Sequence, residues 1–406
     1  MPASDRSRRL ALLQTALVST AFAMQLVVSN AINPLLPIYR EQLDLNAVVL
    51  SLTFVLYVGS LVMVLALLAN PRFARRAPAL LLLSLVVLVA SDLFALQPEP
   101  WSILTARVLV GVAGGLGTGA ASALVVGTIG AAGRSITSTG NMAGAVVGVV
   151  GAQLLVSTVG ADAPALVFVG HAALVVVLFV ALAAVLWVRR RPNARALEHQ
   201  TAAIELEGRQ RPGLRLRLPS RALPLLATGS IAWVTLSISV VFSATIFAEL
   251  GQPVVQAIGP ALLLIASGVL QVASPALTRV APWLSGVLVL AVGAAAVAVG
   301  SVAELPLVAV VGLTLIGAGA GISYRAGLVA LTLGASSSRQ GALASLYAAV
   351  TYGVSAAAGL AVGWVSDVLG FGPTAAGAFG LLAVLALLAL LWAPRLRDTV
   401  EPGVGA

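Results

Sequence analysis

The chain alternates long apolar stretches with short polar breaks. A helix needs about 20 apolar residues to cross the hydrocarbon core of a bilayer. Twelve stretches reach that length, near residues 10–32, 46–69, 78–97, 101–127, 137–159, 164–188, 222–249, 254–276, 282–302, 305–333, 341–365 and 374–393. This pattern predicts an all-α polytopic membrane protein with twelve transmembrane helices.

One polar break is much longer than the others and divides the predicted helices six and six. It runs from Arg189 to Arg221 and is basic and too short for a folded domain. We therefore expect an N-terminal six-helix bundle over 1–188, a cytoplasmic linker loop over 189–221 and a C-terminal six-helix bundle over 222–406. The linker is interpreted as a tether that also touches anionic headgroups, with a regulatory or partner-binding element as the alternative.

The arginines predict the orientation in the membrane. Nine lie between Arg189 and Arg221, and more lie in the other breaks on that side, whereas the opposite loops hold only Arg40. Basic residues gather on the cytoplasmic side of membrane proteins. We therefore predict a multi-pass protein of the cytoplasmic (inner or plasma) membrane with both termini in the cytoplasm.

Composition supports a membrane protein and narrows the chemistry. Hydrophobic residues make up 60% of the chain and charged residues 9%, whereas a soluble domain has about 25% charged residues. Cysteine is absent, and His171 and His199 lie on different segments, so no metal site is expected. No nucleotide loop or nucleophile–base set is present, so we expect no enzyme and no cofactor. The net charge of +9 follows from topology, so we expect the lipid bilayer and no nucleic acid as a partner.

The two halves share a sequence pattern. Gly115–Ser135 and Gly317–Gly341 both begin with glycines at alternate positions, continue with an apolar run and end in a small-residue loop holding one arginine. Each is followed by another helix rich in small residues. Chance similarity in a chain rich in glycine and alanine is the alternative. The pattern predicts two parallel, pseudo-symmetric repeats related by an axis along the membrane normal, as in major facilitator transporters.

Over essentially its whole length the sequence resembles the major facilitator superfamily. Its proton-coupled drug and sugar exporters carry Arg, two residues, Gln and Gly on helix four; Arg107 and Gly111 match, with Val110 in place of glutamine. The stretch from Asn33 to Leu45 is similar to the one after helix one in those exporters.

The loop after the second predicted helix is similar to the family's loop motif but departs from it. Arg72, Arg75 and Arg76 match its arginines, whereas Pro71 stands at the aspartate position. The predicted fifth helix has glycines but lacks the Gly-Pro kink of antiporters. The charge relay that the loop supports in the family is therefore incomplete here.

The resemblance implies a secondary active transporter that works by alternating access. We predict proton-driven efflux of a small amphipathic molecule, such as a drug, sugar or metabolite, by a monomer. The expected partners are this small-molecule substrate and protons. The alternatives are an uptake permease or proton symporter of the same superfamily and, in another class, a non-transporting membrane sensor or scaffold.

The family's cavity is lined mainly by helices 1, 4, 7 and 10, with contributions from 2, 5, 8 and 11. Polar or aromatic residues on these predicted helices are the candidates for lining the substrate cavity: Gln25, Asn30, Tyr57, Arg107, Asn141, Trp233, Tyr324, Arg325, Tyr347 and Tyr352. For a lone Gln or Tyr the alternative is a hydrogen bond between helices. Arg325 either attracts an anionic group in the cavity or extends toward the headgroups.

Three residues are candidates for proton coupling: Asp92, Arg107 and Glu249. An arginine within a bilayer costs at least about 2.5 kcal/mol, so Arg107 needs a partner or a polar cavity. Asp92 lies at a similar predicted depth, and we hypothesise that the two pair, either permanently or until protons or substrate bind. Glu249 is otherwise a plain interfacial acid. His171 is expected to be a hydrogen-bonded structural residue.

Overall fold

The computed structural model describes residues 3–68, 76–97, 99–129, 133–189, 220–335 and 337–399. Within these ranges, the side chains of 3–8, 126–127, 129, 133–142, 189, 337–338 and 341–342 are not described. All regular structure in the described ranges is helical, which confirms the all-α prediction.

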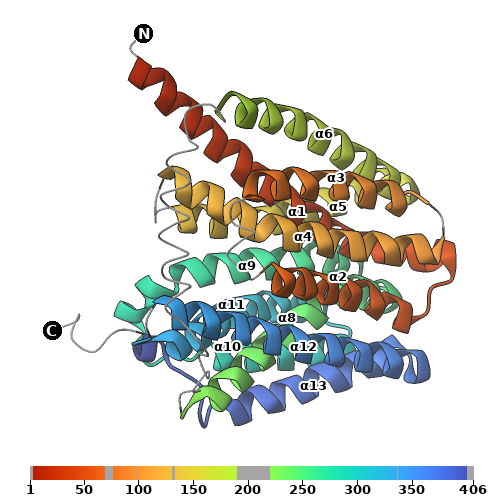
Figure 1. The fold of residues 1–406 in the computed structure, drawn as a ribbon. Coiled ribbons are helices and arrows are strands. Elements are labelled where there is room, and N and C mark those ends of the chain that lie inside the picture. The colour runs from red at the N-terminus through yellow and green to blue at the C-terminus, as the bar shows by residue number, and fades with distance from the viewer. Residues whose placement is uncertain are drawn as a thin grey trace. The chain divides into compact units, whose positions relative to one another are not determined.

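Twelve α-helices follow one another along the described chain (Figure 1). The first six are α1 (Ala3–Leu43), α2 (Ala47–Leu67), α3 (Ala77–Ala95), α4 (Pro100–Ile129), α5 (Gly133–Val159) and α6 (Ala163–Arg189). The other six are α8 (Ala222–Glu249), α9 (Pro253–Val280), α10 (Gly286–Val302), α11 (Pro306–Thr332), α12 (Ser337–Leu369) and α13 (Phe371–Ala389). Two short 3-10 turns, η3 (Gly160–Asp162) and η4 (Leu396–Thr399), complete the list.

The helix lengths fit a bilayer. Ten spans in the described part of the chain are long and apolar enough to cross a membrane, and one of them, Ala143–Val188, covers both α5 and α6. The remaining apolar helix, α10, has 17 residues, the lower end of the length that can cross the hydrocarbon core.

The first helix is longer than predicted. We expected it to end near residue 32, but α1 continues to Leu43 through Pro34 and Pro37. Buried Leu35 and Leu36 continue its apolar face beyond the expected end. Membrane helices tolerate proline because neighbouring groups satisfy the backbone carbonyls that it frees.

The described helices form two compact units. The first holds α1 up to Leu35 and then Leu56 through α6; the second holds Leu36–Val55 and α8 onward. The predicted division placed all of 1–188 in one bundle, so the stretch Leu36–Val55 differs from it. Contacts of this stretch with α8, α12 and α13, described below, account for the difference. The predicted linker lies almost wholly outside the described residues.

The same glycine packing occurs in both units. A Cβ at Gly115 on α4 would overlap Val64 of α2, and a Cβ at Gly317 on α11 would overlap the Leu263 carbonyl of α9. These two glycines are the matched positions of the sequence repeat. Each has a second glycine one turn away that lies against the same neighbouring helix. Small residues at such places let membrane helices approach closely.

Candidate functional site

Arg107 lies in the core of the first unit and is 3% exposed. Its Nη1 donates a hydrogen bond to the Ser29 carbonyl of α1 at 3.1 Å. Its guanidinium carbon is 4.7 Å from the centre of the Tyr57 ring on α2. A cation over a desolvated aromatic ring is stabilised by about 2 kcal/mol. The structure therefore brings together two predicted cavity residues, Arg107 and Tyr57.

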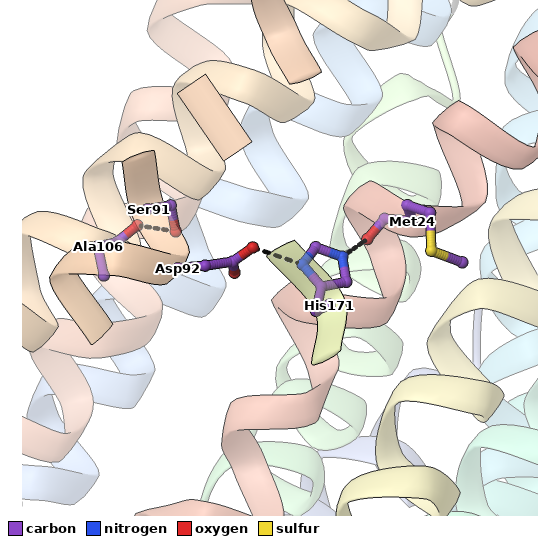
Figure 2. A network of polar contacts seen from close by, with 5 residues as sticks. All are labelled: Met24, Ser91, Asp92, Ala106 and His171. Atoms are coloured by element: carbon purple, nitrogen blue, oxygen red, sulfur yellow. Dashed lines mark hydrogen bonds and ion pairs between the residues drawn. The ribbon is translucent and has the colours of Figure 1, made fainter. Parts of the chain in front are cut away.

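The predicted pair of Asp92 and Arg107 is wrong: Asp92 pairs with His171 of α6 instead (Figure 2). Asp92 Oδ2 lies 2.7 Å from His171 Nδ1, and His171 Nε2 lies 3.0 Å from the Met24 carbonyl of α1. The side chain of Asp92 is 0% exposed and that of His171 4%. His171 is hydrogen-bonded, as expected, and joins three helices.

Helix rotation explains why the predicted pair does not form. Ser91 on α3 donates a hydrogen bond to the Ala106 carbonyl of α4 at 3.2 Å, so Ser91 faces α4. The next residue along a helix is turned by about 100°. Asp92 therefore points away from α4 and toward α6. The prediction compared the depths of Asp92 and Arg107 in the membrane, but depth carries no information on the direction in which a side chain leaves the helix axis.

Gln25 and Asn30 of α1 make short hydrogen bonds within the first unit. Gln25 Nε2 donates to Ser84 Oγ of α3 at 2.9 Å, and Asn30 Nδ2 donates to the Leu26 carbonyl at 2.9 Å. The Gln25 bond is the interhelical bond named as the alternative to a cavity role. Asn30 is half-buried and its amide stays on its own helix.

Several predicted residues lie outside the described part of the structure. The side chain of Asn141 is among them, as are Arg72 and Arg75 of the cytoplasmic loop motif. Arg76 is exposed and immediately precedes α3. These residues stay predictions.

Four predicted cavity residues of the second unit form one aromatic cluster: Trp233 of α8, Tyr324 of α11, and Tyr347 and Tyr352 of α12. The Trp233 ring centre lies 4.9 Å from those of Tyr324 and Tyr352. The rings of Tyr324 and Tyr347 are 5.0 Å apart. Such spacings are those of favourable aromatic pairs, each worth about 0.5–1.5 kcal/mol.

The members of the aromatic cluster differ in burial. Tyr347 is fully buried and its hydroxyl donates to the Tyr324 carbonyl at 3.0 Å. A Cβ at Gly229 would overlap that hydroxyl, so the glycine leaves room for it. Trp233, Tyr324 and Tyr352 are half-buried. The Trp233 Nε1 is buried and has no hydrogen-bond partner among the described residues.

Arg325 follows Tyr324 on α11 and is half-buried. Its Nη1 donates to Ser274 Oγ of α9 at 3.1 Å. The guanidinium therefore lies on the side of α11 that faces α9. In the sequence, Arg325 directly follows Tyr324 of the aromatic cluster. Neither of the two roles predicted for Arg325 included a hydrogen bond to a hydroxyl group of a neighbouring helix.

Glu249 lies at the end of α8 and pairs with Arg40 of α1 within the second unit. The Arg40 guanidinium carbon also lies 4.6 Å from the centre of the Phe371 ring of α13. Asp367 of α12 accepts hydrogen bonds from the backbone amides of Ala47 and Val48 at 2.6 and 3.1 Å. A carboxylate is favourable at a helix N-terminus, here that of α2.

Arg40, Glu249 and Asp367 line a pocket of about 790 Å³ in the second unit. Its lining is mostly polar and includes Arg40, Glu41, Asp44, Glu249 and Asp367. The contacts of Arg40 and Asp367 hold Leu36–Val55 on the second unit. Sequence reasoning missed Asp367, although an acid shortly before a helix break was a usable signal.

The twelve α-helices of the described ranges, most of them long and apolar enough to cross a membrane, define a polytopic all-α fold. Residues 17–360 match the family model of the Major Facilitator Superfamily, so the chain belongs to that family. No curated protein matches the chain.

Solved transporter structures share the fold at low sequence identity. The nucleoside transporter NupG is 13% identical, with a TM-score of 0.65, over 94% of this chain and 98% of that one. A D-xylose–proton symporter is 14% identical, with a TM-score of 0.65, over 98% and 100%. The POT family transporter PepTSo is 14% identical, with a TM-score of 0.64, over 93% and 96%. The predicted fold is confirmed.

Proposed function

We propose that this protein is a monomeric, proton-driven exporter of a small amphipathic molecule in the cytoplasmic membrane. Both termini and the linker would lie in the cytoplasm. Membership of a transporter superfamily supports transport by alternating access, and no enzymatic role is proposed. The observation that carries the substrate part is the aromatic cluster of the second unit.

The aromatic cluster suits the apolar part of such a substrate. Ligand sites are mostly apolar, with a few polar groups that fix the orientation of the ligand. The half-buried rings of Trp233, Tyr324 and Tyr352 offer an apolar surface. The Trp233 Nε1–H, which has no partner among the described residues, offers a hydrogen-bond donor. A substrate with an aromatic or aliphatic ring and an acceptor atom complements these groups.

Neighbouring charge favours substrates with negative or zwitterionic character. Arg325 follows Tyr324 directly, and its bond to Ser274 goes to an uncharged hydroxyl, so that bond does not neutralise its positive charge. Arg325 is therefore the candidate to attract an anionic group of the substrate. Arg107, which lies against a carbonyl and a ring, adds a second positive charge in the first unit.

Export is proposed from the similarity of Arg107 and Gly111 to the helix-four pattern of proton-coupled exporters. Proton drive is supported by buried Asp92 and by Glu249, the two carboxyl candidates. One protein of similar fold is itself a D-xylose–proton symporter. Uptake is therefore the competing direction, and the test must separate the two.

The test measures accumulation of labelled amphipathic molecules in bacteria that lack their main efflux systems. Cells carry the wild type, Trp233→Ala, Trp187→Ala or an empty vector, with and without a protonophore. Trp187 on α6 is 69% exposed within the protein, so its loss controls for removing a tryptophan. Export predicts lower accumulation with the wild type and Trp187→Ala, reversed by the protonophore and by Trp233→Ala.

Other outcomes would overturn parts of the proposal. Higher accumulation with the wild type would establish uptake. Equal effects of the two tryptophan substitutions would remove the aromatic cluster from the substrate site. If no compound of the panel moved and none raised the thermal unfolding midpoint of the purified protein, the sensor or scaffold alternative would replace transport.

A further inference from the structure

The contacts of His171 determine where its protons must lie. A backbone carbonyl can only accept a hydrogen bond, so Nε2, at 3.0 Å from the Met24 carbonyl, must carry a hydrogen. Nδ1 lies 2.7 Å from Asp92 Oδ2. At that distance one proton must lie between the two atoms, on the nitrogen or on the oxygen. Figure 2 shows the imidazole held between the two acceptors.

The charge of the pair also indicates a proton between Nδ1 and Oδ2. When this proton is present, the pair is neutral overall, either as imidazolium and carboxylate or as neutral imidazole and carboxylic acid. Without it, the Nδ1 lone pair faces a carboxylate and the pair carries one negative charge. Asp92 Oδ1 is buried with no hydrogen-bond partner among the described residues. A buried charge that lacks such partners is costly, so the arrangement seen here is the protonated one, and loss of the proton destabilises it.

The surroundings offer no second acid or base in contact with this pair among the described residues. α3 packs against α4 and α6. The other charged residues of these helices are Arg107, which lies on Ser29 and Tyr57, and Arg189, the last residue of α6. Those of α1 and α5 lie near the helix ends: Asp5, Arg6, Arg8, Arg9, Arg40, Glu41 and Arg134.

We infer that Asp92 and His171 form a proton-binding dyad that takes up and releases one proton. On release the proton passes to water, Nδ1 keeps its lone pair, Nε2 keeps its hydrogen and Asp92 becomes a carboxylate. The hydrogen bond between α3 and α6 is then lost. Met24, whose carbonyl accepts from His171, precedes Gln25 in the sequence. Ser91, which precedes Asp92, donates to the carbonyl of Ala106, the residue before Arg107. The dyad is therefore linked through neighbouring backbone to the helix segments that carry Gln25 and Arg107.

The role of this proton in transport rests on the proposed function, but its binding can be tested without a substrate. The chain has two histidines, so His199→Gln leaves His171 as the single histidine. Full-length His199→Gln protein labelled with ¹⁵N-histidine is reconstituted in lipid nanodiscs. Its nitrogen resonances and its carboxylic acid infrared band are recorded from about pH 5 to about pH 9, the range in which histidine titrates.

The dyad predicts one titration step with two signatures. Nε2 stays protonated throughout, while either Nδ1 loses its hydrogen or a carboxylic acid band disappears. Adding Asp92→Asn abolishes the step, because the asparagine amide donates to Nδ1 permanently. If that variant does not fold, His171→Gln replaces it; the glutamine amide donates to Asp92, and the infrared step must vanish.

Constant signals across the pH range, or a step that persists in Asp92→Asn, would overturn the dyad. Neither measurement involves transport, so a failed export assay leaves this result standing. Conversely, proton-driven transport by a protein whose His171 does not titrate would overturn the dyad and retain the proposed function. With both intact, Asp92→Asn should lose accumulation driven by a pH gradient but keep substrate exchange at equal pH.

Discussion

The two units share their helix packing and differ in their polar content. In the first, a guanidinium, a carboxyl and an imidazole are buried, and the guanidinium and the imidazole bond to carbonyls of α1. In the second, α8, α11 and α12 hold four aromatic rings, and α11 also holds a half-buried arginine. At the register that aligns Gly115 with Gly317, Arg107 falls on buried Ala309 and Tyr324 falls on Ser122. The repeat thus retained its packing while each half acquired different chemistry.

The largest effect is expected at the centre of the first unit. Arg107→Ala should reduce transport to background in proteoliposomes, because the Ser29 carbonyl and the Tyr57 ring lose their cation together. A hydrogen bond to a charged group contributes about 1.5–3 kcal/mol, so the thermal unfolding midpoint should fall as well. Arg107→Lys keeps the charge but not the planar group, and should give intermediate activity.

Arg279→Ala is the matched control, since Arg279 is exposed at the end of α9. It should leave both measurements near the wild-type values. Wild-type transport by Arg107→Ala would show that the charged site of the first unit is only structural. The difference in polar content between the two units would then have no consequence for transport.

The second prediction concerns the aromatic cluster. Trp233→Ala removes two ring contacts and should weaken substrate affinity about tenfold, the equivalent of about 1.4 kcal/mol. Trp233→Phe keeps a ring but loses the N–H donor, so its substrate affinity should lie between those of the wild type and Trp233→Ala. Affinity is measured as the half-saturating concentration in proteoliposomes, with Trp187→Ala as the control. An unchanged affinity in Trp233→Ala would remove substrate binding from the second unit.

The sequence predicted the fold better than the sites. Twelve apolar stretches, the central break and the glycine repeat are local patterns, because helix crossing and close packing depend on residues near in sequence. The four residues of the aromatic cluster were cavity candidates because they lie on helices that the family resemblance selected, but their contact with one another was not predicted. The partner of Asp92 could not be predicted, because it depends on the direction in which the side chain leaves α3. A rotation of about 100° around the helix axis, one residue along the helix, separates a side chain that faces α4 from one that faces α6.

The contacts of residues 36–55 were harder to predict for a different reason. Asp367 caps α2 from more than three hundred residues away, and no periodic pattern records that pairing. The length of α1 was also missed, because Pro34 and Pro37 are ordinarily signals that end a helix.

The third prediction tests the packing that the units share. Gly317→Ala places a Cβ against the Leu263 carbonyl of α9 and should destabilise the protein by about 1–3 kcal/mol. Gly119→Ala faces open space on α4, so it should be neutral or stabilise by up to about 1 kcal/mol through helix propensity. Thermal unfolding in nanodiscs measures both. Equal midpoints would mean that the close approach seen in both units does not limit stability.

The smallest effect is expected where the chain of the first helix joins the second unit. Arg40 and Glu249 form an ion pair whose side chains are 31% and 40% exposed. Water and salt screen such a pair, and exposed pairs contribute about 0.2–1 kcal/mol. In a double-mutant cycle, Arg40→Gln and Glu249→Gln should therefore show a coupling in this range that shrinks at high salt.

Asp367→Asn, which weakens the cap of α2, should cost about 1 kcal/mol and respond less to salt, because its bonds go to backbone amides. A cycle with zero coupling, together with an unchanged midpoint in Asp367→Asn, would mean that burial of apolar residues alone keeps Leu36–Val55 on the second unit. The polar contacts would then contribute no measurable stability to the second unit.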